Sequence, residues 1–539
     1  GSVFGGGEDG HVMRDVTMTI SDNAKIGTCG TSYVDGNVFG GGRGFAGDAY
    51  TAGNVAGAVT LNIAGGEMLG SIYGGGRLGS VGYGLYDAGV AGYGEMRDDD
   101  KKDDGTDGTS FFTKGRGHVE ITISGGTIGN DREYIMPTEG FKNWTAEQWT
   151  TWQNNNYVPS TTYDASDGKL HHTRGGNVYA GGMGRRLNLN GEVISMEREG
   201  IDWLKLGNVK STKLTITGGT IKSNVYGGGE YGAVQGSHTT KDSEDNDVNV
   251  GTELIITGGT IGTEIIGASA SDVIYTYGNV YGGGTGTTDD VTITTPVANV
   301  DKLGAYVADN TRVTLTNAKV KASVYGGGEL SAVGGSTYID ISGTTEIGRN
   351  EVRPKSDPNP GYVKYGSWRM GNVYGGGRGS EVAAVAGLVK GNTNINIRGG
   401  NVYHMVYGGG ALASVGTFDL STGSVPAYMP IAGIPYQWHY TNGDVMDPGA
   451  PDGARTPTGT TNITITGGTI GISGRDNGFV FGGSRGDISD PNVYFTADEI
   501  AAASPGDPAY GKTTNDIKDS GFDPYLRVAW VNKSVVNIG

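Results

Sequence analysis

Two short motifs alternate along the whole chain, and this repetition restricts the possible folds more than any other feature of the sequence. The first motif has the form VxLxIxGGTI, and the second is VYGGG, in which Phe sometimes replaces Tyr. Both occur together between Thr212 and Gly229, which read TKLTITGGTIKSNVYGGG. The second motif begins at ten positions: Val3, Val38, Ile72, Val178, Val225, Val280, Val324, Val373, Val406 and Val480. A repeat of this kind indicates a stack of similar units, each of which contacts its neighbours.

The first motif predicts a short β-strand with one buried face, because apolar and polar residues alternate in it, as in Leu214-Thr215-Ile216. The following Gly-Gly pair allows a bend that residues with a Cβ would resist. A second short strand begins at Val225, and a third segment such as Ala233-Val234 completes the circuit. Three short strands per unit describe one coil of a solenoid. We therefore predict an all-β fold, a right-handed parallel β-helix (β-solenoid) of about ten coils.

Long insertions interrupt the repeat at two kinds of corner, so they are expected to emerge on fixed faces of the solenoid. They cover approximately residues 83–116, 130–175, 185–207, 237–249, 263–278, 349–371, 417–459 and 486–532. Some should contain short helices, since Thr145 to Gln148 has the pattern of a capping box, with Trp144 and Trp149 placed as a hydrophobic staple. A similar start occurs at Thr496. We expect residues 1–539 to form one continuous solenoid, a fragment of a longer repeat protein, because both ends fall within a unit.

The composition argues against several classes of partner. The formal net charge is −17, whereas nucleic acids and anionic membranes attract basic surfaces. No apolar run approaches the roughly 20 residues of a membrane-spanning helix, so we predict no membrane span in this segment. Cys29 is the single cysteine, so no intramolecular disulfide is possible.

The aromatic residues suggest where contacts with partners occur. The tyrosines of the VYGGG motif should point away from the valine core and form a stripe, for which we expect a stacking ladder rather than a glycan- or protein-binding strip. All tryptophans lie within insertions, where they are the predicted ligand or partner contacts: Trp144, Trp149, Trp152, Trp203, Trp368, Trp438 and Trp530. The insertions are thus the expected contact surface.

Neither cofactor nor metal chemistry has a complete motif. Asp242, Asp245, Asp247 and Asn249 offer closely spaced oxygen ligands for calcium, but the Gly and Glu of an EF-hand loop are missing. The segments Gly74–Gly79 and Gly227–Gly232 match GxGxxG, which binds a dinucleotide only where it opens a helix. Here it precedes another strand or loop, so we interpret it as a corner. We predict no cofactor-binding residues.

An enzymatic role needs consideration because polysaccharide lyases are found on β-helices. Such an enzyme requires clustered carboxylates, or calcium with a basic residue, on one strand face. From the sequence, we expect the strand faces to carry Thr, Asn and Gly. The seven histidines are scattered along the chain. Neither a zinc-protease HExxH motif nor a nucleophile elbow occurs. We predict no catalytic residues and no enzyme activity.

The alternation of TITGGTIG with GNVYGGG resembles the repeat regions of adhesin-like bacterial surface proteins, which are similar in fold to filamentous-haemagglutinin and pectin-lyase-like β-helices. The resemblance covers the repeats between the insertions. It implies an extracellular location at a bacterial cell surface and a structural or adhesive role as a rigid stalk or filament. The partners would be host or bacterial surface glycans or proteins, or neighbouring copies of the chain. Two alternatives are a carbohydrate-binding or polysaccharide-cleaving β-helix and a self-assembling head-to-tail filament subunit.

Overall fold

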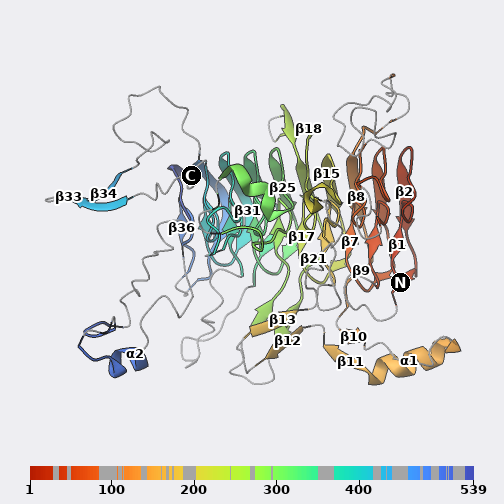
Figure 1. The fold of residues 1–539 in the computed structure, drawn as a ribbon, viewed down its shortest axis with the longest axis horizontal. Helices are drawn as coiled ribbons and strands as arrows, with labels where there is room; N and C mark the ends of the chain where they lie inside the picture. The colour runs from red at the N-terminus through yellow and green to blue at the C-terminus, as the bar shows by residue number, and fades with distance from the viewer. Residues whose placement is uncertain are drawn as a thin grey trace.

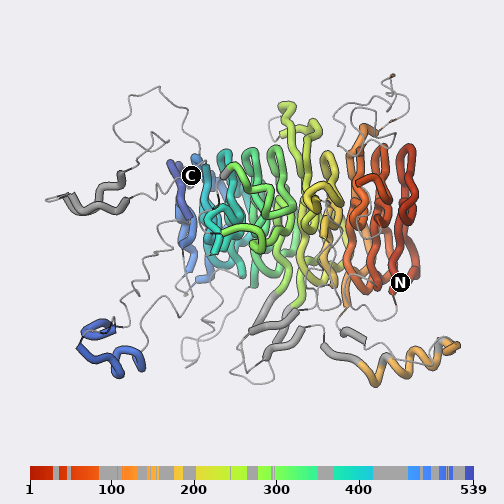
Figure 2. Tube along the Cα trace, viewed as in Figure 1, coloured from red at the N-terminus to blue at the C-terminus, as the bar shows by residue number. Residues whose placement is uncertain are grey.

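The computed structural model describes residues 1–27, 35–44, 50–83, 106, 112, 114–130, 132–134, 143–159, 161–164, 169–172, 175–185, 202–242, 245–266, 274–292, 295, 297–349, 370–380, 382–416, 427–431, 434–439, 459–473, 477–486, 497–505, 507, 509–513 and 529–539. Within these residues the chain is mostly β, with two long, all-parallel sheets (Figures 1 and 2). The predicted all-β class is therefore confirmed, and the arrangement is consistent with a parallel β-helix.

The first sheet consists of the VYGGG motifs. Each of the ten predicted motif positions begins a two-residue strand, and these strands pair in parallel with Val opposite Val or Ile. The order of strands in the sheet equals their order in the sequence: β1 (Val3–Phe4), β4 (Val38–Phe39), β7 (Ile72–Tyr73), β14 (Val178–Tyr179), β17 (Val225–Tyr226), β24 (Val280–Tyr281), β27 (Val324–Tyr325), β30 (Val373–Tyr374), β32 (Val406–Tyr407) and β36 (Val480–Phe481).

The second sheet has 17 strands and is built from the VxLxIxGGTI motifs. Its long strands are β2 (Val16–Ile20), β5 (Val59–Ile63), β8 (His118–Ile123), β15 (Ser211–Ile216), β20 (Thr252–Ile256), β25 (Thr311–Thr316), β28 (Thr337–Ser342), β31 (Thr393–Val402), β35 (Thr460–Ile470) and β37 (Lys533–Ile538). Short strands follow the Gly-Gly bend: β3 (Lys25–Ile26), β6 (Glu67–Met68), β9 (Thr127–Ile128), β16 (Thr220–Ile221), β21 (Thr260–Ile261), β26 (Lys319–Val320) and β29 (Glu346–Ile347). β31 and β35 each run through the bend as one strand.

Valines also form a third line of parallel contacts. Isolated bridges join Val209 to Val234, Val234 to Val307 and Val307 to Val333, which confirms the predicted third short segment. The inward residues of all three lines belong to one continuous hydrophobic cluster, in which Leu214 and Val225 are fully buried. Each strand is too short to bury this apolar surface alone, so the stacking of neighbouring units supplies the core.

The glycine triplets are required by close contact between neighbouring units. A Cβ on Gly227 would lie 2.2 Å from the carbonyl oxygen of Gly282, a distance that real Cβ atoms do not reach. Gly219, in the Gly-Gly bend, has a φ of +84°, a conformation that favours glycine. In the GxGxxG match, Tyr231 also has a positive φ, of 64°. The segment therefore forms a corner between strands, as predicted, and no helix follows it.

The outward rings of the VYGGG motif form one aromatic stack. Neighbouring rings lie parallel, with centroids 4.5 Å apart for Phe39 and Tyr73 and 5.0 Å apart for Tyr226 and Tyr281. The tyrosines between the ends are buried, Tyr281 completely. In chain order, the stacked rings are those of Phe4, Phe39, Tyr73, Tyr179, Tyr226, Tyr281, Tyr325, Tyr374, Tyr407 and Phe481. The stacking ladder is confirmed, and its buried tyrosines do not form a binding strip.

Several insertions form antiparallel hairpins, which the sequence patterns did not indicate. The described pairs are β10 (Arg132–Tyr134) with β11 (Tyr157–Pro159), β12 (Thr161–Asp164) with β13 (Lys169–His172), β18 (His238–Lys241) with β19 (Asp247–Val250), β22 (Glu264–Ile266) with β23 (Ile274–Thr276), and β33 (Ala427–Ile431) with β34 (Ile434–His439). The hairpin β18–β19 projects beyond the long strands (Figure 1). The predicted insertions therefore contain more strand than we expected.

Helices occur in the insertions as predicted. The first, α1 (Ala146–Asn155), begins with the predicted capping box, since Thr145 accepts a hydrogen bond from the Gln148 backbone and its own N–H donates to the Gln148 side chain. The second predicted helix is α2 (Ala497–Ala502). Thr496, the residue before it, lies outside the described residues. Short 3-10 helices occur at η3 (Trp203–Lys205) and η4 (Val297–Leu303). The segment around η4 is an additional insertion that the sequence analysis missed.

Candidate functional site

The outer face of the long-strand sheet carries charged side chains that pair across neighbouring strands. Register aligns Glu120 of β8 with Lys213 of β15, Lys213 with Glu253 of β20, and Glu253 with Arg312 of β25. Acidic and basic residues thus alternate on adjacent strands. The prediction that these faces carry only Thr, Asn and Gly is wrong for this part of the sheet. The signal was present, because each charged residue occupies the same outward position of its VxLxI motif.

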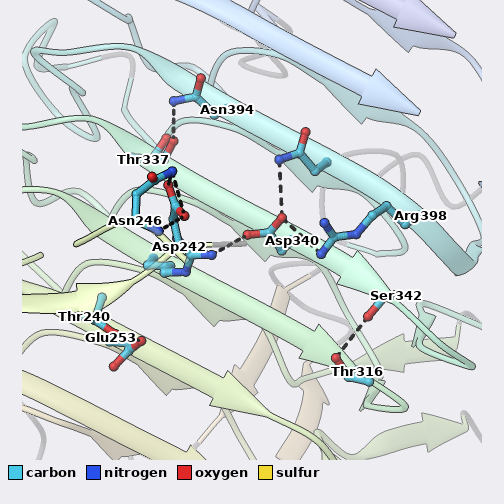
Figure 3. Close-up of polar contacts among 12 residues, drawn as sticks. Thr240, Asp242, Asn246, Glu253, Thr316, Thr337, Asp340, Ser342, Asn394 and Arg398 are labelled. Carbon is cyan, nitrogen blue, oxygen red and sulfur yellow. Dashed lines mark hydrogen bonds and ion pairs between the residues drawn. The ribbon is translucent and has the colours of Figure 1, made fainter. Parts of the chain in front are cut away.

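Asp340 on β28 is the centre of one part of this face (Figure 3). Its carboxylate accepts a hydrogen bond from Arg312 at 3.1 Å and another from the Asn396 amide at 3.3 Å. The guanidinium of Arg398 lies 3.6 Å away as a second cationic partner. Asp340 and Arg312 are both buried. A buried charge is costly unless it is paired and hydrogen-bonded, and this carboxylate satisfies both conditions.

Glu253 on β20 is the centre of the other part. Thr240 of β18 donates a hydrogen bond to its carboxylate at 2.7 Å, and the Lys213 ammonium lies 3.1 Å away. The imidazole of His238, also on β18, is 3.6 Å from the carboxylate. Burial acts to raise the pKa of Glu253, but the nearby His238 imidazole, the hydrogen bond from Thr240 and the charge of Lys213 outweigh it and lower the pKa to about 2. Glu253 is therefore ionised at neutral pH.

Two histidines lie beside this carboxylate. The Nδ1 atom of His118 on β8 is 2.8 Å from the Ser211 hydroxyl, and the rings of His118 and His238 are 4.8 Å apart. Burial lowers the pKa of His118 to about 3, with further contributions from His238 and Lys213. His118 is thus neutral at pH 7. The Ser211 residue is only 1% exposed, so this Ser–His contact does not present a nucleophile at the surface.

These contacts join parts of the chain to one another. Every carboxylate discussed above has a cation or a hydrogen-bond donor beside it within the protein. In the described ranges there is no group of three or more His, Cys, Asp or Glu side chains suited to hold a metal ion. The side chains of β18 attach the hairpin β18–β19 to β8 and β20.

The predicted calcium ligands lie in that hairpin and its turn. Asp242 accepts hydrogen bonds from the backbone and side chain of Asn246, at 2.9 Å for the backbone N–H. Asp247 pairs with Lys241 at 2.8 Å, and the side chain of Asn249 accepts from Thr239 at 3.0 Å. Asp245 has a positive φ of 65° within the turn. The structure thus uses Asp242, Asp247 and Asn249 within the hairpin, and they do not converge on one point as calcium ligands.

Three of the predicted contact tryptophans form a cluster at helix α1. The rings of Trp144 and Trp149 meet edge-on with centroids 5.2 Å apart, and those of Trp144 and Trp152 are 5.4 Å apart. The predicted hydrophobic staple is therefore confirmed. The three tryptophans are half-buried, and none of the α1 side chains that the structure describes is fully buried. Figure 1 shows α1 outside the two long sheets.

The remaining tryptophans differ in their surroundings. The indole of Trp203 in η3 lies under the Arg185 guanidinium, 4.1 Å from its central carbon, and packs against the aromatic stack. Arg185 in turn pairs with Asp289 and Asp290. Trp203 therefore packs within the chain while staying half-buried, and its role as a partner contact stays a prediction. Trp530 is half-buried, and its backbone N–H donates to the Ser414 hydroxyl at 3.0 Å. Trp368, the side chain of Trp438, and Cys29 lie outside the described residues.

Comparison with known proteins found no similar family model, no similar curated protein and no similar solved structure. The resemblance to adhesin-like repeats therefore remains a hypothesis. None of the described helices is long and apolar enough to span a bilayer.

Proposed function

We propose that this chain belongs to an adhesin-like protein of a bacterial cell surface, in which it serves as a rigid extracellular stalk or filament. In this proposal the parallel sheets are walls of a closed, right-handed β-helix of about ten coils. The support is the regular pairing: each strand from β4 to β32 in the first sheet has a parallel neighbour on both sides. Such a stack is rigid along its length, because each unit is held by hydrogen bonds, core contacts and stacked rings.

The aromatic cluster of Trp144, Trp149 and Trp152 is the proposed contact surface, and its exposure carries the adhesive part of the proposal. These rings contact one another on a helix without fully buried described side chains. Aromatic residues are enriched at interfaces, where they add large contact area with little loss of side-chain freedom. The partners would be surface glycans or proteins.

The test combines shape with binding. Electron microscopy of the purified chain should show short rods, and binding to glycan arrays or to bacterial and host cells should be detectable. Replacement of all three tryptophans by Ala should reduce that binding at least tenfold, whereas a Glu147→Ala, Thr151→Ala variant of the same helix should retain it. Globular particles would contradict the scaffold, and undiminished binding by the tryptophan variant would contradict the contact surface.

One observation favours the carbohydrate-cleaving alternative, namely the carboxylates on the outer face of the sheet. Glu253 and Asp340 are buried and paired with Lys213 and Arg312. A polysaccharide would have to displace these partners, so we favour the scaffold. Release of reducing sugar ends that Asp340→Asn abolishes would establish the enzyme instead. Head-to-tail assembly remains a prediction, which electron microscopy of concentrated samples tests.

A further inference from the structure

The hairpin β18–β19 is held to the sheet by a small polar contact at its base. Alternate residues of β18, His238 and Thr240, reach the side chain of Glu253 on β20. The ring of His238 also lies against that of His118 on β8, with centroids 4.8 Å apart. The tip of the hairpin, where Lys241 faces Asp247, projects beyond the sheet (Figure 1).

Apolar contacts add little to this attachment. No residue of β18 is fully buried, and of β19 only Val250, at the base, is buried. Elements with few buried apolar contacts open at a lower free energy than the core. The hairpin should therefore open at a lower free energy than the buried strands beneath it.

The charges at the base make this contact sensitive to protons. His118 is faced by Ser211 and Lys213 of β15, by His238 of β18, by Glu253 of β20 and by Lys114, which precedes its own strand. A proton on His118 would be placed in a half-buried position near Lys213. The ring of His238 lies 4.8 Å from that of His118. Glu253 is the single acidic group in this set, and it already pairs with Lys213.

We propose that β18–β19 is an acid-opened flap, in which protonation of His118 at its base releases the hairpin and uncovers the polar face of β8, β15 and β20. This inference is independent of the adhesive function proposed above. Opening of the hairpin would uncover the side chains of Glu253, Lys213, His118 and Ser211.

The sign of the effect follows from the pKa of His118. Burial, with His238 and Lys213, lowers this pKa to about 3 in the closed state, and exposure would return it towards its ordinary value of about 6.5. A lowered histidine pKa favours the closed state at high pH, and this preference is lost as the pH falls from about 6.5 towards 3. At pH 5 the opening equilibrium should be shifted about 30-fold relative to pH 7.5 if the full difference is released.

Hydrogen exchange of the full chain, followed by mass spectrometry, tests the flap. Protection of peptides covering residues 238–250, corrected for intrinsic exchange at each pH, should fall about 30-fold between pH 7.5 and pH 5. His118→Asn, which keeps a neutral polar group near Ser211, should reduce this change to less than about threefold. His11→Asn changes an exposed histidine elsewhere and should behave like the unaltered chain.

Two results would overturn the flap. One is equal protection of residues 238–250 at both pH values in the unaltered chain, a measurement that does not depend on any variant folding. The other is a pH response of His118→Asn as large as that of the unaltered chain. A fall in protection confined to this hairpin, with constant protection of β20, would support the proposal.

Discussion

The hydroxyl of Tyr226 donates a hydrogen bond to Glu329 at 2.5 Å, although 103 positions separate the two residues in sequence. The same carboxylate forms an ion pair with Arg378. Burial, together with the negative charge of Glu329, raises the pKa of Tyr226 well above its usual value, so the phenol stays neutral and donates. Tyr73 makes the same contact with Glu230, also at 2.5 Å. The aromatic stack is thus linked to a neighbouring line of charged residues that follow the glycine triplets.

Replacing Glu329 by Gln should destabilise the chain by about 2 kcal/mol, because it removes the charge-assisted contacts with Tyr226 and with the partly exposed Arg378. The free energy of unfolding in urea measures this effect. Glu67→Gln is the matched control, since Glu67 is 47% exposed and pairs with Lys25 at 3.7 Å; its expected cost is below about 0.5 kcal/mol. Equal losses in both variants would contradict a special role for Glu329.

Gly282→Ala should prevent normal stacking of two units. Its Cβ would lie 2.1 Å from the Gly326 carbonyl oxygen and 3.0 Å from the Gly326 carbonyl carbon, and these backbone atoms cannot move aside as a flexible side chain could. We expect a loss of about 3 kcal/mol or more in stability, seen in thermal unfolding followed by circular dichroism. Gly483→Ala serves as control, because nothing lies within 4 Å of its Cβ position. A tolerated Gly282→Ala would show that neighbouring units can separate without cost.

Thr311→Val should cost about 1 kcal/mol, the net value of one buried hydrogen bond. The Thr311 hydroxyl donates to the Gly326 carbonyl at 2.6 Å. The aligned residue in three earlier strands is valine, as at Val119, so the methyl group fits the site. Thr311→Ser, which keeps the hydroxyl and loses a methyl, distinguishes the hydrogen bond from packing in urea unfolding. If Val stabilises the chain, packing outweighs the hydrogen bond at this position.

Acid should weaken the chain through Glu253 in a lower pH range than through His118. The pKa of Glu253 is lowered to about 2 because hydrogen bonds and Lys213 outweigh the opposing effect of burial. A carboxylate with a lowered pKa stabilises the folded chain above its ordinary pKa near 4.5, and this contribution is lost as the pH falls towards 2. Glu253→Gln should therefore flatten the decline of the thermal midpoint between pH 4.5 and 2.5.

The control for this prediction is Glu147→Gln on helix α1, which should follow the unaltered chain over the same range. Parallel pH curves for Glu253→Gln and the unaltered chain would show that Glu253 does not stabilise the fold. The Lys213→Met variant should raise the pKa of Glu253, as measured by NMR titration, because it removes a positive charge 3.1 Å away.

The strands were predictable because their signals are local. Val225-Tyr226 and its nine equivalents begin strands where the motif predicted them, since each unit repeats the same apolar spacing. The capping box at Thr145 needs only four residues and was predicted as well. The hairpin β18–β19 was missed, because its strands contain mostly polar residues, His-Thr-Thr-Lys and Asp-Val-Asn-Val, without a clear buried face.

The site was less predictable, because its contacts join residues that insertions of different length separate. Glu253 and His118 lie on strands with β15 between them, yet His238 of the hairpin contacts both. Trp203 lies in an insertion, and its contact with Arg185 cannot be read from the sequence because the insertion between them has no repeat pattern.

The sequence by itself determined the period of the repeat, the inward valines and isoleucines, and the glycines at the corners, because strand alternation and backbone crowding act over a few residues. The tertiary structure decided which outward side chains meet. Stacking brings Tyr226 to Glu329 and His118 to His238, and those contacts depend on the register between units and on how each insertion folds back. Their ionisation follows from burial and neighbouring charge, which exist only after the units have stacked.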